Sequence, residues 1–526
     1  MANGKSLIII SAVLACTGAF AQTPYMNAEL SSQDVIGDAR YVGMGGAMGA
    51  LGANLSAMSS NPAGIGLYRR SDASLSFSVL TQNNKPDLNE DMTHMSFDQM
   101  GFVFNAPIGG EHVKYLNFAV NYQKKVNFNN SFIADNSTLN GLSQTQEMAD
   151  LWNNTSYTTP LADLMYQSCL INPVYTDEEG NYSSVDGFAS DANLYDRTTE
   201  GSIDGYEFNI SANVDDKVFL GVTVGVNDVD YFSYSRYTEL GEVNYSDGSA
   251  ESGVEYYTVY NTQHLSGYGV NIKFGAIFFP IDGSPFRIGI AGESPTFYHL
   301  DYTSAYSIDS PMYETDGEIY IGSDYYTYSD TRDKLRLRIK TPWKVRVSLG
   351  HTIGTYLAIG AEYEYANYGK TKQSYDDWDW EWGDNDAVDD YDMNALTKQT
   401  LQASHSFKLG LEFNITENLA VRAGYNYYSS MFEDNATLDV TNPSSAFNYV
   451  ATTDYLNKGD VNIYTVGLGY HGKHLYADVA YKFRSQSGDF YAFDDTNIYT
   501  DDTGRLQPVN VDLDTHQVFF SLGYKF

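Results

Sequence analysis

Two groups of residues in this 526-residue chain have types and spacing that could bind metal. The stretch DDWDWEWGDNDAVDDYD, residues 376–392, is dense in carboxylates, which are ligands for Ca²⁺ or for divalent ions that bridge to lipopolysaccharide. It lacks the EF-hand spacing, so a solvated acidic loop is favoured over a metal site. His471 and His474 share a short turn. Two histidines are a weak metal signal, and solvated turn residues explain them better.

The familiar enzyme motifs are missing. The sequence has no G-x-S-x-G, no H-E-x-x-H, no phosphate-binding loop and no cysteine pair with metal spacing. Cys169 is the only cysteine beyond the first 21 residues, so no internal disulfide can form after these are removed. We therefore expect a protein that is not an enzyme and has no cofactor and no metal. A lipase-like barrel with dispersed catalytic groups is the open alternative.

The first residues, MANGKSLIIISAVLACTGAFAQ, have the pattern of a secretory signal peptide. Their apolar stretch is about half of the roughly 20 residues that a membrane-spanning helix needs. We expect residues 1–21 to be removed on export. Cleavage before Cys16 as a lipoprotein is the weaker alternative, because Leu14 fits poorly two positions before that cysteine.

The chain is strongly acidic, with a formal net charge of −36, or −37 once Lys5 leaves with the signal. Such a field repels nucleic acid, so we expect no nucleic-acid partner. No later apolar run is long enough for a spanning helix. A membrane barrel stays open, because the alternating residues of its strands average out in hydropathy.

Period-two alternation of apolar and polar residues runs from residue 73 to the end of the chain. In YLAIGAEYEYANY, residues 356–368, Leu, Ile, Ala and Tyr occupy one face and Glu362 and Glu364 the other. The same pattern appears in KVRVSLG, SFKLGLEF and LYADVAYKFR. Alternation alone fits both a soluble sandwich and a membrane barrel.

The lengths and connections of the strands favour the membrane barrel. Very short turns, such as VDDK (214–217) and ITEN (415–418), alternate with long polar loops, as in outer-membrane barrels. The pattern predicts an all-β fold, a transmembrane antiparallel barrel of about fourteen strands over residues 73–526, with both termini periplasmic. The predicted strands are 73–84, 98–108, 113–128, 205–213, 218–241, 262–281, 284–309, 335–353, 355–375, 400–415, 418–432, 461–472, 474–493 and 510–526.

Aromatic residues mark the strand ends and the C-terminus. Tyrosines crowd DVDYFSYSRYTE and GYNYYSS, as in a girdle at the lipid headgroups, although tyrosine is favoured in any strand. A C-terminal aromatic that ends an alternating strand resembles the signal read by the outer-membrane assembly machinery. In HQVFFSLGYKF the residues that share this face include Phe520, Leu522, Tyr524 and the terminal Phe526.

A compact, glycine-rich segment precedes the first strand. It includes YVGMGGAMGALGANLSAM and SSNPAGIGLYRR, lacks strand alternation and is too apolar for a solvated linker. A barrel this wide cannot be filled by its own side chains, so we expect residues 22–72 to plug it. The glycines expected to allow close backbone packing in the lumen are Gly43, Gly45, Gly46, Gly49 and Gly52.

The motif Asn61-Pro62-Ala63-Gly64 in this segment resembles the hatch motif of the FadL/TodX family of transporters of hydrophobic compounds. The stretch TPWKVRVSLGHTIGTYLAIGAEYEYANYGK is similar to later barrel strands of that family. The resemblance implies passive uptake of a hydrophobic small molecule, such as a long-chain fatty acid, another lipid or an aromatic compound. It also implies a multi-pass protein of the Gram-negative outer membrane, in contact with its lipids. Without its context, Asn-Pro-Ala-Gly is an ordinary turn sequence.

The same resemblance implies a path for the ligand. The loop 129–204 is similar to the family's extracellular capture site, although its apolar residues could equally pack it onto the barrel rim. The candidate capture residues are Leu151, Trp152, Leu161, Leu164 and Met165. In the family a kinked third strand opens the wall for lateral exit. Here that strand, VKYLNFAVNYQKKVNF, has no Gly or Pro, so a fully paired wall would count against such an exit.

The alternative function is a plugged barrel that acts as a surface receptor or as a partner in protein secretion. A transporter needs an apolar pocket continuous with the loops, whereas an interaction barrel can be packed solid. Strong acidity at the mouth favours a neutral or metal-bridged ligand over a free fatty-acid anion. The lumen-facing charges expected to pair with one another, or with Arg40, Arg69 and Arg70 of the plug, are Glu362, Glu364, Arg346, Lys408 and Arg422.

Overall fold

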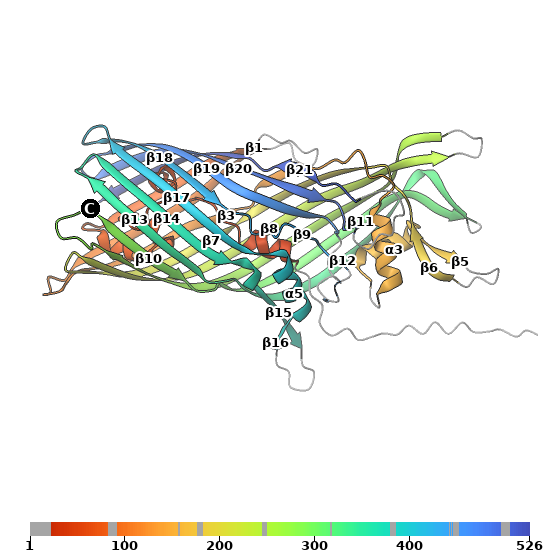
Figure 1. The fold of residues 1–526 in the computed structure, drawn as a ribbon, viewed down its shortest axis with the longest axis horizontal. Coiled ribbons are helices and arrows are strands. Elements are labelled where there is room, and N and C mark those ends of the chain that lie inside the picture. Colours follow the sequence, from red (N-terminus) through yellow and green to blue (C-terminus); the bar gives the residue numbers. More distant parts are fainter. Residues whose placement is uncertain are drawn as a thin grey trace, which may run out of the picture.

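The main element of the computed structural model is a closed antiparallel barrel of fourteen strands (Figure 1), as the alternation predicts. The first barrel strand pairs with the last, from Asp72 opposite Lys525 to Gln82 opposite Thr515, which closes the ring. The predicted signal peptide lies outside the described residues. The structure describes residues 23–82, 92–155, 158–175, 182–244, 250–315, 318–378, 385–440, 442, 444, 452–495 and 505–526.

The barrel strands follow chain order around the ring, and some positions consist of two strands in line. The single strands are β1 (Asp72–Gln82), β2 (Thr93–Pro107), β7 (Ala192–Val214), β8 (Val218–Asn244), β9 (Ala250–Phe278), β17 (Ala403–Asn414), β18 (Leu419–Tyr428), β19 (Tyr455–His471) and β20 (Leu475–Tyr491). The strands in line are β3 (Val113–Asn127) with β4 (Asn130–Ile133), β10 (Arg287–Glu293) with β11 (Phe297–Thr315), β12 (Glu318–Lys340) with β13 (Lys344–Ile353), β14 (Leu357–Asn367) with β15 (Lys372–Trp378), and β21 (Val509–Asp512) with β22 (Thr515–Lys525).

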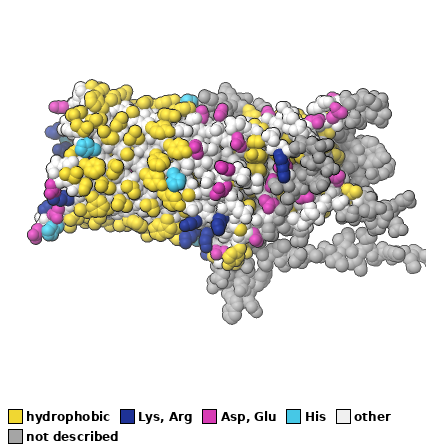
Figure 2. Space-filling view, viewed as in Figure 1, with side chains coloured by type: hydrophobic (Ala, Val, Ile, Leu, Met, Phe, Trp, Pro, Cys, Tyr) yellow, Lys and Arg dark blue, Asp and Glu magenta, His cyan; other side chains and the backbone are white. Residues whose placement is uncertain are grey.

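Apolar side chains lie on the outer surface of the barrel. On β13, Val345 and Val347 are 49% and 43% exposed, whereas Arg346 and Ser348 between and beside them are buried in the lumen. Figure 2 shows the resulting belt of hydrophobic side chains over one half of the face in view. A soluble sandwich would bury this face, so the exposed belt identifies a membrane-spanning barrel.

The two ends of the barrel differ, as the connections predict. Short turns and the C-terminus lie at one end, and the long connections form a cap at the other (Figure 1). The cap contains α3 (Gln144–Asn154), α4 (Pro160–Gln167), β5 (Ile171–Tyr175) and β6 (Tyr182–Gly187), and beside it lie β16 (Asn385–Asp389) and α5 (Tyr391–Thr400). None of the helices in the described ranges is both long and apolar enough to cross a membrane.

Several strands are longer than the sequence pattern predicts. Strand β7 begins at Ala192 rather than at residue 205, and the segments between the predicted strands at 242–261 and 310–334 belong largely to the hairpins β8–β9 and β11–β12. The sequence of 310–334 is rich in Tyr, Ser, Thr and Asp and lacks the sustained apolar alternation of the belt strands. Pairing between neighbours sustains the extensions, as in the continuous register from Ala192 to Val214 against β8.

The N-terminal segment, residues 23–71, lies inside the ring of strands and is here called the hatch (Figure 1). Its short helices are α1 (Pro24–Leu30), α2 (Ala39–Gly43), η1 (Ser56–Ser59) and η2 (Pro62–Leu67). Asp38 joins α2 to η1, because its carboxylate accepts hydrogen bonds from the Tyr41 amide at 3.0 Å, Asn54 at 2.9 Å and Ser56 at 2.8 Å. The hatch is thus a compact unit despite its lack of strands.

Candidate functional site

The predicted hatch motif is docked on the barrel wall. Asn61 caps η2, where its Oδ1 accepts a hydrogen bond from the Ala63 amide at 3.1 Å. Its Nδ2 donates to the Ala276 carbonyl of β9 at 3.3 Å. The Pro62 carbonyl accepts from Asn209 at 3.2 Å and Ser211 at 2.8 Å, both on β7. The motif is a turn, as its composition suggests, and it is also the contact that seats the hatch.

Glycines of the wall make this close approach possible. A Cβ at Gly221 of β8 would lie within 2.6 Å of the Ala63 nitrogen and overlap the Pro62 backbone, and one at Gly275 of β9 would overlap the Asn61 amide. On the opposite wall, glycines on four neighbouring strands stand in register, and they are Gly350, Gly360, Gly410 and Gly424. At least two of them face hatch carbonyls, because a Cβ at Gly360 or Gly410 would overlap the carbonyl of Ala47 or Met44.

Three of the predicted hatch glycines, Gly43, Gly45 and Gly49, face the wall, whereas Gly46 and Gly52 face Tyr41 and Gly64 inside the hatch. Gly45, Gly46 and Gly52 adopt φ values of 59°, 70° and 59°, which favour glycine. A Cβ at Gly43 would lie 3.3 Å from the Cα of Gly467, and one at Gly49 would overlap the Glu362 carboxylate. Sequence reasoning found these hatch residues but missed their partners on the wall. The signal was present as glycine at lumen-facing positions of otherwise alternating strands.

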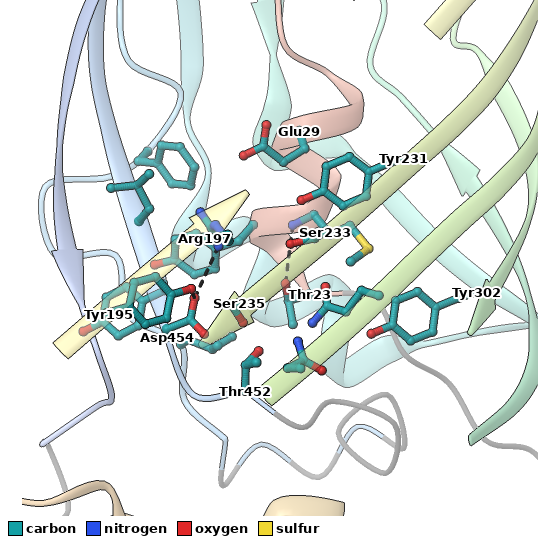
Figure 3. Close-up of a pocket in the computed structure, with 18 residues that line it drawn as sticks. Thr23, Glu29, Tyr195, Arg197, Tyr231, Ser233, Ser235, Tyr302, Thr452 and Asp454 are labelled. Atoms are coloured by element: carbon teal, nitrogen blue, oxygen red, sulfur yellow. Dashed lines mark hydrogen bonds and ion pairs between the residues drawn. The ribbon is translucent and has the colours of Figure 1, made fainter. Parts of the chain in front are cut away.

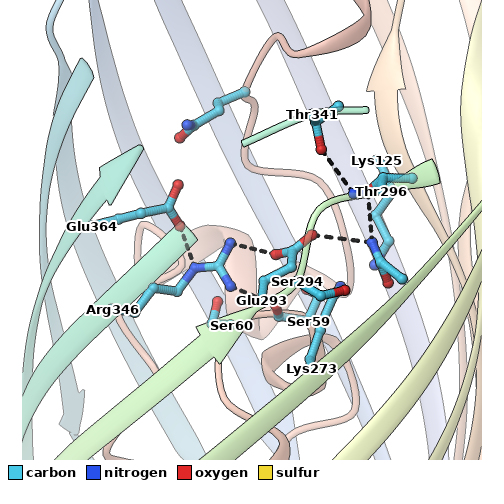
Figure 4. Close-up of polar contacts among 12 residues, drawn as sticks. Ser59, Ser60, Lys125, Lys273, Glu293, Ser294, Thr296, Thr341, Arg346 and Glu364 are labelled. Carbon is cyan, nitrogen blue, oxygen red and sulfur yellow. Dashed lines mark hydrogen bonds and ion pairs between the residues drawn. The ribbon is translucent and has the colours of Figure 1, made fainter. Parts of the chain in front are cut away.

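Buried ion pairs line the lumen above the hatch. Arg346 contacts Glu364 on β14 and lies 2.8 Å from Glu293 on β10 (Figure 4). Glu207 of β7 pairs with Lys273 at 2.6 Å and with Lys125 at 2.8 Å. A further pair, Lys408 with Glu362 at 2.9 Å, confirms the predicted pairing among lumen charges.

A second ion cluster joins the hatch to the wall. Arg40 of α2 lies 2.8 Å from Glu412 of β17, which also pairs at 2.6 Å with Arg422 of β18. Arg422, whose side chain is fully buried, reaches Asp478 of β20 at 2.6 Å. The prediction that Arg40 pairs with a lumen charge is thus confirmed. The prediction for Arg69 is wrong, because it pairs at 2.7 Å with Asp216 in a turn at the rim.

Three cavities form a row from the cap to the hatch. The upper cavity, of about 60 Å³, lies between α1 and strands β7, β8, β9, β11 and β19 (Figure 3). The middle cavity, of about 80 Å³, shares Glu29 and Arg197 with it. The lower cavity, of about 130 Å³, shares Ser32, Gln33 and Asp34 with the middle one and is lined by the ion pairs around Arg346. The hatch segment 29–34 therefore borders the whole row.

The upper cavity combines aromatic rings with polar groups. The aromatic side chains that line it are Tyr25, Tyr195, Tyr231, Tyr302, Tyr455 and Phe432. Asp454 accepts hydrogen bonds from the Tyr195 hydroxyl at 2.8 Å and from Arg197 at 3.3 Å (Figure 3). Asn261 is 3% exposed, and within the described part of the chain its Oδ1 accepts no hydrogen bond. This cavity can hold an apolar group and offers one buried acceptor.

The candidate capture residues lie in the core of the cap. Leu151, Leu161, Leu164 and Met165 are at most 3% exposed, and the ring of Trp152 stacks on Tyr166 with 4.8 Å between centroids. These five residues lie on the helices α3 and α4. Their role in capture stays a prediction, and their packing attaches the loop to the rim in this conformation.

One buried carboxyl makes the cap sensitive to pH. Burial raises the pKa of Glu147 on α3 well above its usual range, and the nearby Asp494 carboxylate adds to the rise. In the unfolded cap this group ionises at about pH 4.3. The free energy of unfolding of the cap therefore falls as the pH rises above that value, because the unfolded form releases the proton more readily than the folded form. We expect Glu147→Gln to stabilise the cap at pH 7.5, by about 1.4 kcal/mol for each unit of the rise.

Limited proteolysis of the cap at pH 5 and pH 7.5 measures this effect. The variant should lose the faster cleavage that the wild type shows at pH 7.5. Glu200→Gln, at an exposed position on β7, is the control that should leave both rates unchanged. Equal pH dependence in the wild type and Glu147→Gln would contradict the assignment.

The third barrel strand is paired along its length with β7 but along only part of its length with β2. Residues Tyr115–Gln123 of β3 pair with β2, and Val113–Asn127 pair with β7 through two irregularities. The ladder between β2 and β3 ends at Gln99 opposite Gln123, so residues 93–98 of β2 and 124–127 of β3 do not pair with each other. The wall is therefore not fully paired at this strand, and the lateral opening that the family resemblance implies stays a prediction.

The predicted metal candidates do not come together. His471 lies 3.4 Å from Asp478, whereas His474 contacts the Lys525 carbonyl at 2.9 Å. Within the described ranges, no three His, Cys, Asp or Glu side chains are grouped so that they could hold a metal ion. Part of the acidic stretch, residues 379–384, lies outside the described residues.

Comparison with known proteins bears on the fold. No family model matches the chain, and no curated protein matches it. A solved FadL homologue from Pseudomonas aeruginosa is 14% identical, with 94% of this chain and 99% of that chain covered and a TM-score of 0.50. The Ralstonia pickettii toluene transporter TbuX is 13% identical, with 93% and 98% covered and a TM-score of 0.47. The chain therefore has the fold of the FadL homologue, a plugged barrel of fourteen strands.

Proposed function

We propose that the protein is a bacterial outer-membrane transporter that takes up hydrophobic small molecules passively. The shared fold and the resemblance of its hatch motif to that of the FadL/TodX family support this proposal. In it, residues 1–21 are the export signal, residues 22–72 the hatch and residues 73–526 the barrel. The terminal Phe526, 62% exposed on the outer wall, is the residue read by the assembly machinery.

The row of cavities between cap and hatch carries the proposal. Its upper member presents aromatic rings for an apolar body and the Asn261 oxygen for a hydrogen-bond donor. The net charge of −36 repels anions, and four of the five cations that line the lower cavity, Lys125, Lys273, Arg346 and Lys408, pair with carboxylates. The substrate class that fits is a neutral molecule with an apolar body and one donating group, such as a long-chain alcohol.

Passage requires the hatch to move. Each cavity is smaller than the roughly 300 Å³ at which ligand pockets begin. The segment 29–34 borders all three, so its displacement would join them. Two ion pairs hold this segment in place, Glu29 with Lys458 and Asp34 with Lys482. These contacts are the ones that a substrate must break.

A flux measurement with adjacent substitutions tests the route. Asn261→Trp fills the upper cavity, whereas Thr262→Trp puts the same ring on the other face of β9. We expect proteoliposomes with the wild type or Thr262→Trp to pass 1-dodecanol faster than protein-free liposomes, and Asn261→Trp to lose most of that flux. Wild-type flux equal to the protein-free rate would contradict transport. Equal flux through both variants would contradict the route.

A receptor or protein-secretion role is the second candidate. The small cavities and the ion-paired lumen favour it, because an interaction barrel can be packed solid. In this case the long strands and helices at the cap end would present the partner surface. Absence of flux in the wild type, together with a stoichiometric protein that co-purifies from native membranes, would favour this function over transport.

A further inference from the structure

The barrel wall is interrupted at one place on its outer surface. Pairing of the eighth and ninth barrel strands stops at Lys340 opposite Lys372 and resumes at Lys344 opposite Ala366. Pro342 lies in the gap and cannot donate to the ladder, and the facing chain leaves the sheet as the short helix η3 (Tyr368–Lys370). The interruption leaves a groove of about 520 Å³.

The groove has an apolar part and a basic part. Trp343, Val345 and Tyr365 line it with side chains that are 55%, 49% and 38% exposed, and they belong to the hydrophobic belt. Four exposed lysines also line it, and they are Lys340, Lys370, Lys372 and Lys398. Figure 2 shows Lys and Arg side chains gathered at this height, where the belt meets the polar cap end.

This concentration of positive charge is unusual in the chain, which has 31 Lys and Arg against 67 Asp and Glu. Lys340 lies 5.4 Å from the centroid of the Phe297 ring. Asp389 and Asp392 on β16 and α5 are exposed nearby in the chain, but among the described residues no carboxylate forms an ion pair with the four lysines. All four lysines are exposed, so an anion from outside the protein can reach them.

We propose that this groove binds the phosphorylated headgroup of a glycolipid of the outer leaflet. The lysines lie on the cap side of the belt, at the level of lipid phosphates, and they would contact those phosphates. Trp343, Val345 and Tyr365 would lie against the upper parts of the acyl chains. A soluble anion would use the lysines but not the apolar wall below them, so the combination favours a lipid. This inference rests on the proposed outer-membrane location.

Lipid retention by a charge-neutralised variant tests the proposal. The test variant replaces three lysines of the groove and keeps Lys340, and its substitutions are Lys370→Gln, Lys372→Gln and Lys398→Gln. The control removes three lysines at the short-turn end, and its substitutions are Lys114→Gln, Lys217→Gln and Lys473→Gln. Each detergent-solubilised protein is mixed with diphosphorylated lipid A, and bound lipid is measured by native mass spectrometry.

We expect one tightly held lipid on the wild type and the control, and at least about tenfold weaker binding by the groove variant, since each lysine contributes roughly fivefold. Lipid A without phosphates should bind the wild type no better than it binds the variant. Equal retention by both triple variants would overturn the proposal. Displacement of the lipid by millimolar inorganic phosphate would also overturn it, because a lipid site needs the acyl chains. Dodecanol flux is measured separately, so failure here leaves the transport test intact.

Discussion

Replacing Gly221 with valine is expected to unseat the hatch and open the barrel. The new side chain would enter the space of the Pro62 carbonyl and the Ala63 nitrogen, which are backbone atoms and cannot rotate away. Overpacking of this kind costs about 1 to 3 kcal/mol, and the hydrogen bonds of Pro62 to Asn209 and Ser211 would be strained as well. Since Gly221 pairs with Gly275, the Asn61 contact beside it would also be weakened.

Single-channel conductance in planar bilayers measures the result. The wild type should conduct little, because the hatch fills the lumen. Gly221→Val should show openings that approach those of a variant lacking residues 41–66. Ala423→Leu adds the same number of carbon atoms at an exposed position on the outer face of β18, and it should conduct like the wild type. A closed Gly221→Val barrel with normal assembly would contradict this account of the hatch.

Local alternation is enough to predict which face of a strand is polar and which is apolar. In residues 356–368 it separates Glu362 and Glu364 from Tyr363 and Tyr365, and the structure buries these glutamates in the lumen while Tyr365 is 38% exposed. The combination of this pattern with short turns at one end favours a membrane barrel over a soluble sandwich. That information is local in the chain, so it can be read without knowledge of the fold.

Contacts between distant residues could not be predicted in the same way. The motif at Asn61 indicates a hatch, but its partners Ser211, Gly221 and Gly275 lie about 150 to 215 residues away, and only the register of β7, β8 and β9 brings them together. The groove at Pro342 has the same origin, since Lys372 and Lys398 reach it through pairing and packing of separate elements. The residue types indicate the separate segments of each site, but only the strand topology brings those segments together.

The extended strands beyond the belt show a second limit. Residues 310–334 are rich in Tyr, Ser, Thr and Asp, a composition that equally suits a solvated loop. In the structure β11 and β12 pair as far as Thr315 and Glu318. Backbone pairing with the neighbouring strand determines that this segment is a strand. The segment has no sustained hydrophobic pattern from which the strand could be predicted.

The largest expected loss of stability is that of Arg422→Leu. This side chain is fully buried and lies 2.6 Å from both Glu412 and Asp478. Its removal leaves Asp478 without its arginine and Glu412 with Arg40 alone, and breaking a buried pair in this way costs about 3 to 5 kcal/mol. Urea unfolding in detergent, followed by the loss of β-sheet circular dichroism, should show a correspondingly lower midpoint.

Neutralising the three wall residues of the cluster should recover much of this loss, because the cost arises from uncompensated charges rather than from lost packing. The recovery variant combines Arg422→Leu with Glu412→Gln and Asp478→Asn. It leaves Arg40 without its carboxylate, so the hatch should be held more weakly even when the barrel is stable again. A urea midpoint restored towards that of the wild type, together with raised conductance, would therefore show that one ion cluster stabilises the wall and also holds the hatch. A restored urea midpoint with a closed pore would instead show that the Asn61 contact alone holds the hatch.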